Sequence, residues 1–294
     1  MNHSNQTDVK IGFIGAGKVG CTLGRFFAEH GASVTAYASR SLKSAEEAAA
    51  LTGAVACRDP QELLSACGMV FLTVPDGAIT QVYRQIASES PQLLEGKLLY
   101  HCSGALAARD AFPESEKYGA KTASVHPIFP VSNKETVWRE LKSAYFCLEG
   151  DEGAVSAAET LLARCAVKFQ RINPADKTKY HAGCVFASNL VCALMQESFR
   201  LLEDCGFTQE GARAALSPLI RSNLDHVLSD GAVQALTGPV ERCDAGTVEK
   251  HLTVLDGEAE ALYRASSLVL TQIAQEKHPE TDYTGLRNLL EEET

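Results

Sequence analysis

Short apolar runs alternate with helix-like stretches through the first 173 residues of this 294-residue chain, and no strand-like run follows them. The runs span residues 9–14, 32–38, 69–74, 97–100, 122–125, 144–148 and 167–172. Such alternation predicts βαβ units, whose parallel strands are apolar throughout because helices cover both faces of the sheet. We therefore expect an α/β protein in which residues 1–173 form a Rossmann-type domain with a parallel sheet.

The rest of the chain, residues 174–294, shows only helical patterns. A long helix is expected from Ala175 to about Cys205, where Gly206 supplies a C-terminal stop. Shorter helices are expected at residues 209–216, 218–228, 245–255 and 258–275, with a loop at 231–244 and a frayed acidic tail after Lys277. The second domain is thus expected to be all-helical.

Composition and charge narrow the range of partners. A content of 45% hydrophobic and 22% charged residues is typical of a globular protein. A net charge of −10 without any basic run opposes binding to nucleic acid or to an anionic membrane. The chain lacks a transmembrane-length apolar run, and its polar N-terminus does not resemble a signal peptide. The ten scattered cysteines, without a C-x-x-C pair, predict a reduced, cytoplasmic protein.

A glycine-rich sequence, Gly15-Ala16-Gly17-Lys18-Val19-Gly20, follows the first apolar run and fits G-x-G-x-x-G. In a strand–turn–helix context, Gly15 permits a tight turn and Gly17 lets the backbone approach a pyrophosphate. Gly20 allows close packing of helix on strand, and the N–H groups of the helix N-terminus face the phosphates. The alternative is a glycine-rich turn without a ligand; the position between the first strand and a helix favours a dinucleotide site.

The end of the second strand distinguishes NAD from NADP. An NAD site places a carboxylate there to bind the ribose hydroxyls, whereas this chain has Ala38-Ser39-Arg40-Ser41. A carboxylate would repel a 2′-phosphate, while the guanidinium of Arg40 and the hydroxyl of Ser39 can hydrogen-bond to it. The sequence predicts NADP(H) as the cofactor, unless Arg40 is only a solvated loop charge.

Further motifs accompany the glycine sequence. They are Thr73-Val74-Pro75-Asp76, His101-Cys102-Ser103-Gly104, Ser124-Val125-His126-Pro127, Asp176-Lys177-Thr178-Lys179-Tyr180-His181, Ala187-Ser188-Asn189 and residues 236–244. With them, the chain resembles bacterial two-domain proteins in which a Rossmann-like domain precedes a C-terminal domain of unknown function. These are relatives of the superfamily of 6-phosphogluconate dehydrogenase, 3-hydroxyisobutyrate dehydrogenase, ketopantoate reductase and pyrroline-5-carboxylate reductase.

This resemblance implies a 6-phosphogluconate-dehydrogenase-like helical domain that forms a homodimer. It also implies that the loops after two strands line the cofactor, through Val74, Pro75, Cys102 and Ser103. One departure concerns residue 243, where the family usually carries Gly and this chain has Cys243. Gly adopts a positive φ at little cost and Cys does not, so the conformation of that loop is an open question.

Lys177 and His181 lie four residues apart at the start of the expected long helix, and Ser188 and Asn189 follow near the same face. In the dehydrogenases that the chain resembles, this helix carries a Lys as acid/base and an Asn four residues later. Lys177 matches that Lys, and His181 replaces the Asn. Either side chain can give a proton to a carbonyl oxygen or imine nitrogen as hydride arrives from NADPH. The alternative is a solvated Lys177 and a packed His181.

Ser103 and His126 follow predicted parallel strands at the edge where open α/β sheets bind ligands. Ser103 is a candidate donor to a substrate carbonyl or to the nicotinamide carboxamide, and His126 a candidate pocket residue; both are alternatively loop staples. A zinc site is not predicted, because among the histidines and cysteines of this region only His181-x-x-Cys184 has a ligand spacing.

Two functions remain open. The first is an NADP-dependent oxidoreductase that transfers a hydride to a small ketone, keto acid or imine. The second is a non-catalytic NADP(H)-binding sensor or partner-binding protein, which the replacement of the expected Asn by His181 keeps in consideration. In residues 237–244, Arg242 either pairs with Asp244 as a clamp or binds a substrate carboxylate.

Overall fold

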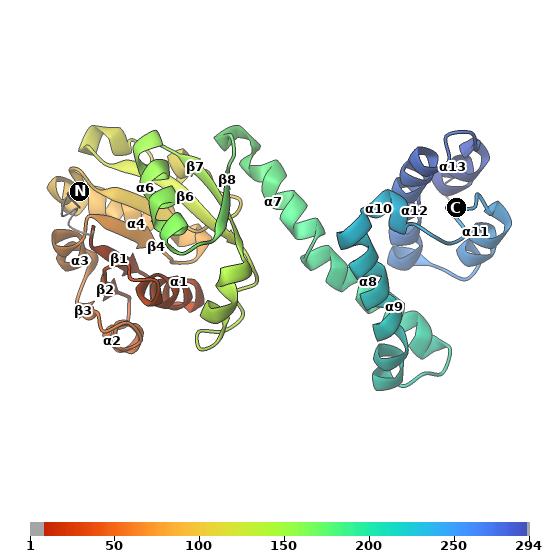
Figure 1. Ribbon diagram of the computed structural model, residues 1–294, viewed down its shortest axis with the longest axis horizontal. Coiled ribbons are helices and arrows are strands. Elements are labelled where there is room, and N and C mark those ends of the chain that lie inside the picture. Colours follow the sequence, from red (N-terminus) through yellow and green to blue (C-terminus); the bar gives the residue numbers. More distant parts are fainter. Residues whose placement is uncertain (1–8, 293–294) are drawn as a thin grey trace, which may run out of the picture. The chain divides into compact units, whose positions relative to one another are not determined.

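The computed structural model describes residues 9–292 and divides into two compact units, Met1–Val185 and Phe186–Thr294 (Figure 1). The polar N-terminal stretch was compared above with a signal peptide. Most of it lies outside the described residues. No helix within residues 9–292 has both the length and the apolar character needed to cross a lipid bilayer. The first unit is an α/β domain and the second is helical, which confirms the expected fold class.

The first unit contains one sheet. Its strands are β1 (Ile11–Ile14), β2 (Val34–Ala38), β3 (Val55–Cys57), β4 (Met69–Leu72), β5 (Leu98–His101), β6 (Lys121–Ile128), β7 (Tyr145–Gly150) and β8 (Lys168–Arg171), in the order β3-β2-β1-β4-β5-β6-β7-β8. The expected parallel arrangement holds from β1 to β6. It fails at β7, which runs antiparallel to β6, with β8 parallel to β7. Strand β3 was not predicted, since three residues carry too little periodicity.

Helices cover both faces of this sheet (Figure 1). They are α1 (Lys18–Glu29), α2 (Leu42–Ala50), α3 (Pro60–Ala66), α4 (Asp76–Glu89), α5 (Ala108–Ala111) and α6 (Glu152–Arg164); a further helix, α7 (Lys177–Phe186), follows β8. On the face of α1 and α6, the stacked rings of Tyr37, Phe13, Phe71 and Tyr100 cross four neighbouring strands, with centroids 5.3, 5.3 and 4.7 Å apart. On the other face α3 and α4 pack on aliphatic residues such as Leu72 and Leu99. Burial on both sides explains the uninterrupted apolar runs.

The second unit is made of helices in its described part. They are α8 (Asn189–Asp204), α9 (Gln209–Asp230), α10 (Ala232–Ala235), α11 (Ala245–Leu252), α12 (Gly257–Lys277) and α13 (Thr284–Glu291). A core of small and aliphatic residues joins α11, α12 and α13 around the buried ring of Tyr283.

Four expected features of this region were wrong. The loop expected at residues 231–244 begins with a short helix, α10. The long helix is interrupted at residues 187–188, between α7 and α8. Helix α9 continues through Pro218, where two helices were expected, because an exposed proline removes one backbone hydrogen bond without having to leave the helix. The tail is not frayed as far as residue 292: Tyr283, Leu286 and Leu290 are each no more than 2% exposed, since their spacing gives α13 an apolar face.

The division between the units falls after Val185, later than the boundary at 173/174 expected from the last strand. The 3-10 turn Pro174–Asp176 and all of α7 except its last residue, Phe186, belong to the first unit by their contacts. Within this segment, the side chain of Lys177 is buried against the sheet with 1% of its surface exposed.

Candidate functional site

The glycine-rich bend after β1 is held against the ends of two neighbouring strands. Gly15 has φ +117°, and its amide donates to the carbonyl of Ala38 at the end of β2 over 2.8 Å. Its own carbonyl accepts from the hydroxyl of Thr73, which follows β4, over 2.8 Å. A Cβ on Gly15 would lie 2.7 Å from the Thr73 backbone, and a Cβ on Gly20 would meet Thr73 Oγ1 at 2.5 Å. Both glycines are therefore required by close packing.

Gly17, in contrast, faces open space. It is the N-cap of α1 and makes no side-chain cap, and the nearest atom to a Cβ placed there would be the Thr73 carbonyl oxygen at 4.0 Å. Gly17 and Lys18 are exposed, Val19 is half-buried, and Ala16 is buried in the bend. The backbone N–H groups at the start of α1 are thus accessible, as a pyrophosphate site requires.

Ser39 and Arg40 lie directly beside this bend, because Ala38, which binds the amide of Gly15, precedes them. Ser39 is half-buried and Arg40 is exposed. Within residues 9–292, no hydrogen bond or ion pair occupies the Arg40 guanidinium. The hydroxyl of Ser41 instead caps α2 by accepting from Ser44 N over 3.4 Å. An uncommitted cation beside the bend fits a 2′-phosphate.

The loops after β4 and β5 are joined by Ser103. Its hydroxyl donates to Asp76 Oδ2 over 2.5 Å and accepts from the amides of Ala105 and Leu106 over 3.3 and 3.0 Å. Val74 and Cys102 are half-buried nearby in sequence, and Pro75 is exposed as the N-cap of α4. Because a hydroxyl has a single hydrogen, the bond to Asp76 favours a loop-positioning role for Ser103 over donation to a substrate.

A row of polar side chains crosses three neighbouring strands. His101 of β5 pairs in register with Ser124 of β6, which pairs with Glu149 of β7, so the three side chains share one face of the sheet. All three are buried, at 0%, 0% and 2% exposure. His101 Nδ1 accepts from the amide of Ser103 over 3.1 Å, and Glu149 Oε1 accepts from the amide of Ala108 over 3.0 Å. His101 Nε2 and Glu149 Oε2 have no hydrogen-bond partner in the described part of the chain.

Lys177 lies across this row. Its ammonium donates to Ser124 Oγ over 2.5 Å and lies 3.7 Å from Glu149 Oε1. Burial lowers the pKa of Lys177 and raises the pKa of Glu149, and the opposite charge of each partner offsets part of both shifts. Lys177 is therefore not the solvated first-turn residue that was the alternative. Glu149 was missed by sequence reasoning, because only the register of two strands places it beside this lysine.

Two imidazoles meet over Gly104. Strand β6 extends beyond the end of β5, which carries His126 past Ser124 on the same face. The rings of His126 and His181 have centroids 6.1 Å apart. A Cβ on Gly104 would lie 2.9 Å from His126 Nε2 and 3.0 Å from His181 Nε2, so only glycine allows this approach. Neither Nε2 atom has a hydrogen-bond partner among residues 9–292.

The other ring nitrogen of His126 is occupied by Tyr180, which sequence reasoning did not single out. His126 Nδ1 and Tyr180 OH are 2.6 Å apart. Burial, followed by the charge of Lys177, lowers the pKa of His126 to about 4, so this ring is uncharged at neutral pH. Burial raises the pKa of Tyr180 well above its usual range, so its hydroxyl keeps its hydrogen.

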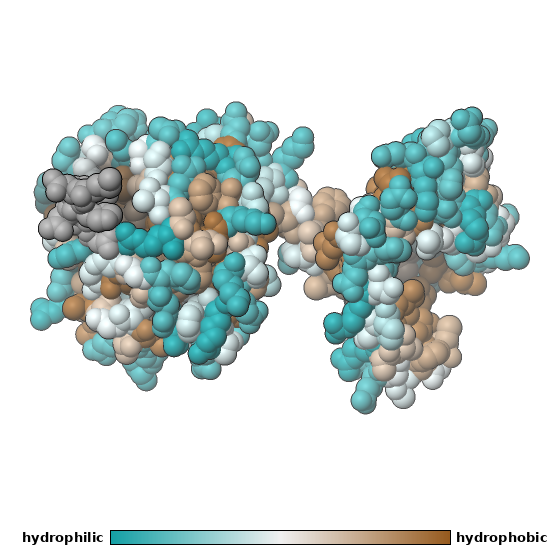
Figure 2. All heavy atoms as spheres, viewed as in Figure 1, coloured by the Kyte–Doolittle hydropathy of each residue, from teal (hydrophilic) through white to brown (hydrophobic). Residues whose placement is uncertain are grey.

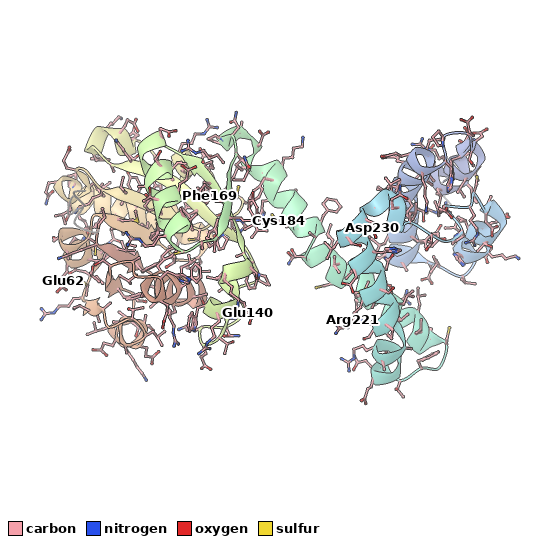
Figure 3. The ribbon with its side chains drawn as sticks, viewed as in Figure 1. Glu62, Glu140, Phe169, Cys184, Arg221 and Asp230 are labelled. Atoms are coloured by element: carbon pink, nitrogen blue, oxygen red, sulfur yellow. The ribbon has the colours of Figure 1, made fainter. Side chains whose placement is uncertain are left out.

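Ser188 and Asn189 follow the end of α7, and both are exposed. Ser188 Oγ donates to Asn189 Oδ1 over 3.1 Å. They belong to the second unit, so their predicted place near Lys177 and His181 stays a prediction. On α7 itself, Figure 3 marks Cys184, three residues beyond His181. No group of three or more potential metal ligands is placed to bind an ion within residues 9–292.

The loop at residues 237–244 is not held by a hydrogen-bonded pair of Arg242 and Asp244 but by other contacts. Asp244 caps α11 by accepting from Thr247 N over 3.0 Å, and no described hydrogen bond or ion pair joins it to Arg242. Cys243, where the family usually has Gly, takes φ +53° in the left-handed region. A non-glycine residue costs about 1 kcal/mol there. The backbone thus keeps the conformation that suits the family's glycine.

Two family models match the chain. Residues 10–100, which contain the glycine-rich bend and Arg40, match the model described as NADP oxidoreductase coenzyme F420-dependent. Residues 144–269 match a domain of unknown function, DUF2520, which contains Glu149, Lys177 and His181. A comparison with curated protein sequences finds no match.

Solved structures share the fold. Protein TM1727 from Thermotoga maritima is 27% identical with a TM-score of 0.71, over 91% of this chain and 99% of that one. An imine reductase from Myxococcus stipitatus in complex with NADP+ is 16% identical with a TM-score of 0.63, over 91% and 93%. A pyrroline carboxylate reductase from Plasmodium falciparum with NADP bound is 15% identical with a TM-score of 0.57, over 91% and 98%.

The buried His101 should make the first unit less stable in acid. Burial lowers its pKa to about 3, so between pH 6.5 and 3 the unfolded chain binds a proton that the folded chain does not. Above pH 6.5 this histidine does not lower the free energy of unfolding. Below pH 6.5 the free energy of unfolding should fall by about 1.4 kcal/mol per pH unit because of it. His101→Asn keeps an acceptor for Ser103 N and should remove that share of the slope. Urea unfolding followed by the fluorescence of the single tryptophan, Trp138, measures it.

His226→Asn, at an exposed position in α9, serves as the control and should leave the slope unchanged. Equal slopes for wild type and His101→Asn would contradict the expectation.

Proposed function

We propose that this chain is an NADPH-dependent reductase of a small ketone, keto acid or imine, because residues 10–100 match an NADP oxidoreductase model and residues 144–269 match DUF2520. The observation that carries the proposal is the pair of unpartnered Nε2 atoms of His126 and His181 over Gly104. They lie at the strand edge that also carries the glycine-rich bend. Reductases among the solved structures with this fold support the same chemistry.

The cofactor is held, in this proposal, by the bend at residues 15–20 and by Ser39 and Arg40. The accessible amides at Gly17 and the start of α1 bind the pyrophosphate. The Arg40 guanidinium binds the 2′-phosphate, which no carboxylate at the end of β2 opposes. The loops that contain Val74, Pro75 and Cys102 lie along the same edge and line the nucleotide.

We expect NADPH to bind more tightly than NADH, and Arg40→Ala to remove most of the difference. Loss of one charge-assisted bond to a phosphate should weaken NADPH binding about tenfold to a hundredfold and leave NADH binding unchanged. Isothermal titration calorimetry with both nucleotides measures this. Arg84→Ala, an exposed arginine well inside α4, is the control. Equal affinities of the wild-type protein for the two nucleotides would refute the assignment.

The reaction needs a hydride at the carbon and a proton at the oxygen or nitrogen of the C=O or C=N bond. NADPH, when bound, supplies the hydride and leaves as NADP+. Of the two candidate proton donors, Lys177 has its ammonium engaged by Ser124 and lies beside Glu149. His181 is half-buried and has an unpartnered Nε2. We therefore assign His181 as the proton donor and Lys177 as a buried charge behind it.

His181→Gln should lower kcat about a hundredfold, because general acid catalysis contributes at about that level. NADPH affinity should stay within about twofold, since the bend is untouched. NADPH oxidation with a panel of small ketones, keto acids and cyclic imines measures the first, and calorimetry the second. Lys179→Gln, exposed two residues away, is the matched control. Turnover unchanged by His181→Gln would refute this role, and tight NADPH binding without any turnover would favour the sensor.

The second unit supports a homodimer. Leu190 and Leu194 of α8, and Leu224, Val227 and Leu228 of α9, are exposed at helical spacings, with Leu228 83% exposed. Figure 2 shows hydrophobic surface over this region. An apolar stripe on two packed helices is self-complementary when it pairs with a second copy of the chain.

The double variant Leu224→Asp/Leu228→Asp should be a monomer, because a buried, unpaired carboxylate opposes association. Light scattering should give twice the chain mass for the wild-type protein and the single-chain mass for the variant. A wild-type monomer at micromolar concentration would contradict the dimer.

A further inference from the structure

His126 is surrounded by groups that control both its charge and the position of its hydrogen. One ring nitrogen faces Tyr180 OH at 2.6 Å, and the other lies over Gly104 without a partner. Glu149 is buried on the same face of the sheet, opposite Ser124 and therefore two residues back along β6 from His126, and Lys177 is buried beside it. Neither Tyr180 nor Glu149 has a role in the proposed function as stated so far.

We propose that Tyr180 and the Lys177–Glu149 pair are positioning residues that hold His126 as an uncharged hydrogen-bond donor, with its Nε2 hydrogen directed to the ligand over Gly104. The inference rests on the proposed reductase function and names the group that binds the oxygen or nitrogen of the reacting double bond. His181 then remains the acid, and His126 holds the same atom without giving up its hydrogen.

Tyr180 sets the tautomer. An uncharged imidazole carries one hydrogen, and whichever nitrogen accepts a hydrogen bond leaves the hydrogen on the other. The Tyr180 hydroxyl stays protonated and lies 2.6 Å from Nδ1. In the proposed arrangement it donates to Nδ1, which leaves the hydrogen of His126 on Nε2. The two rings also meet edge to face, with centroids 5.7 Å apart, which fixes the plane of the imidazole.

Lys177 sets the charge. Its ammonium is anchored by Ser124 Oγ at 2.5 Å and by Glu149 Oε1 at 3.7 Å, and all three side chains are buried. The positive charge disfavours a second positive charge on the nearby His126 ring. Glu149 is what makes a buried ammonium tolerable, since an unpaired one would lose its proton. The charged and titratable groups that face His126 are Lys177, Tyr180 and His181, all from α7. The further groups that face Lys177 are His101 and Cys102 from β5 and its loop, and Cys147 and Glu149 from β7.

An uncharged imidazole suits this task. It donates a strong hydrogen bond to a developing negative charge. It is also too weak an acid to lose its N–H proton to water at neutral pH. The donor requires a lone pair on the ligand. A carbonyl oxygen or a neutral imine nitrogen has one, and a protonated iminium does not. The arrangement therefore favours substrates that enter the site unprotonated.

Nitrogen-15 NMR of histidine-labelled protein tests the inference without any turnover. In the wild type, the His126 signals should show the Nε2–H tautomer and no titration above about pH 5. Tyr180→Phe should give a mixture of tautomers. Lys177→Met should raise the titration midpoint of His126 by about one pH unit, because the charge has gone. Glu149→Gln should also raise the titration midpoint of His126, because Lys177 without its partner loses its proton more readily.

Glu152→Gln, an exposed carboxylate on α6, is the matched control and should change neither signal. If Glu149→Gln does not fold, the double variant Glu149→Leu/Lys177→Met replaces the pair by apolar residues, which buried ion pairs often tolerate. It should show the same raised midpoint as Lys177→Met.

An unchanged His126 midpoint in Lys177→Met, in Glu149→Gln or in the double variant would overturn the inference, as would an unchanged tautomer in Tyr180→Phe. The proposed function fails separately, when the wild-type protein shows these NMR signatures but oxidises NADPH with none of the carbonyl or imine compounds.

Discussion

The buried ammonium of Lys177 is the interaction on which the arrangement of the candidate site depends. A charge of this kind is costly in a protein interior unless hydrogen bonds and an opposite charge surround it. Ser124 and Glu149 supply both, from two antiparallel strands that meet in register. In doing so they fix the first turn of α7 to the sheet. One turn further along this helix, Tyr180 is placed beside His126 and His181 over Gly104 as a consequence.

The edge of the sheet carries two separate kinds of candidate binding surface. At β1, β2 and β4, where the strand order reverses, the bend offers backbone amides and the exposed Arg40. This is the topological switch point at which open α/β sheets bind nucleotides. Beyond the ends of β5 and β6, the imidazoles of His126 and His181 meet over Gly104. Thr73, Asp76 and Ser103 connect the two through hydrogen bonds, so that the bend and the histidines belong to one framework.

The helical unit shows why local patterns misled. Pro218 predicts a helix end, but α9 continues because one missing backbone bond is a small part of a helix of 22 residues. The acidic residues after Lys277 predict a frayed tail, but the three apolar side chains of Tyr283, Leu286 and Leu290 outweigh them once a core is present to receive them. Cys243 adopts a left-handed backbone that its own side chain disfavours, because contacts such as the Asp244 cap hold the loop on either side.

The sequence by itself determined the features that depend on neighbours along the chain. The alternation of apolar runs and helices identified the sheet, the spacing of Gly15, Gly17 and Gly20 identified the bend, and a spacing of four put Lys177 and His181 on one helix. Only the tertiary structure decided that Lys177 is buried, that Glu149 is its partner and that Tyr180 binds His126. The lysine is 53 residues from Ser124, and Tyr180 is 54 residues from His126. Their chemistry follows from strand register and burial, which no periodicity along the chain encodes, because desolvation depends on residues brought together only when the chain folds.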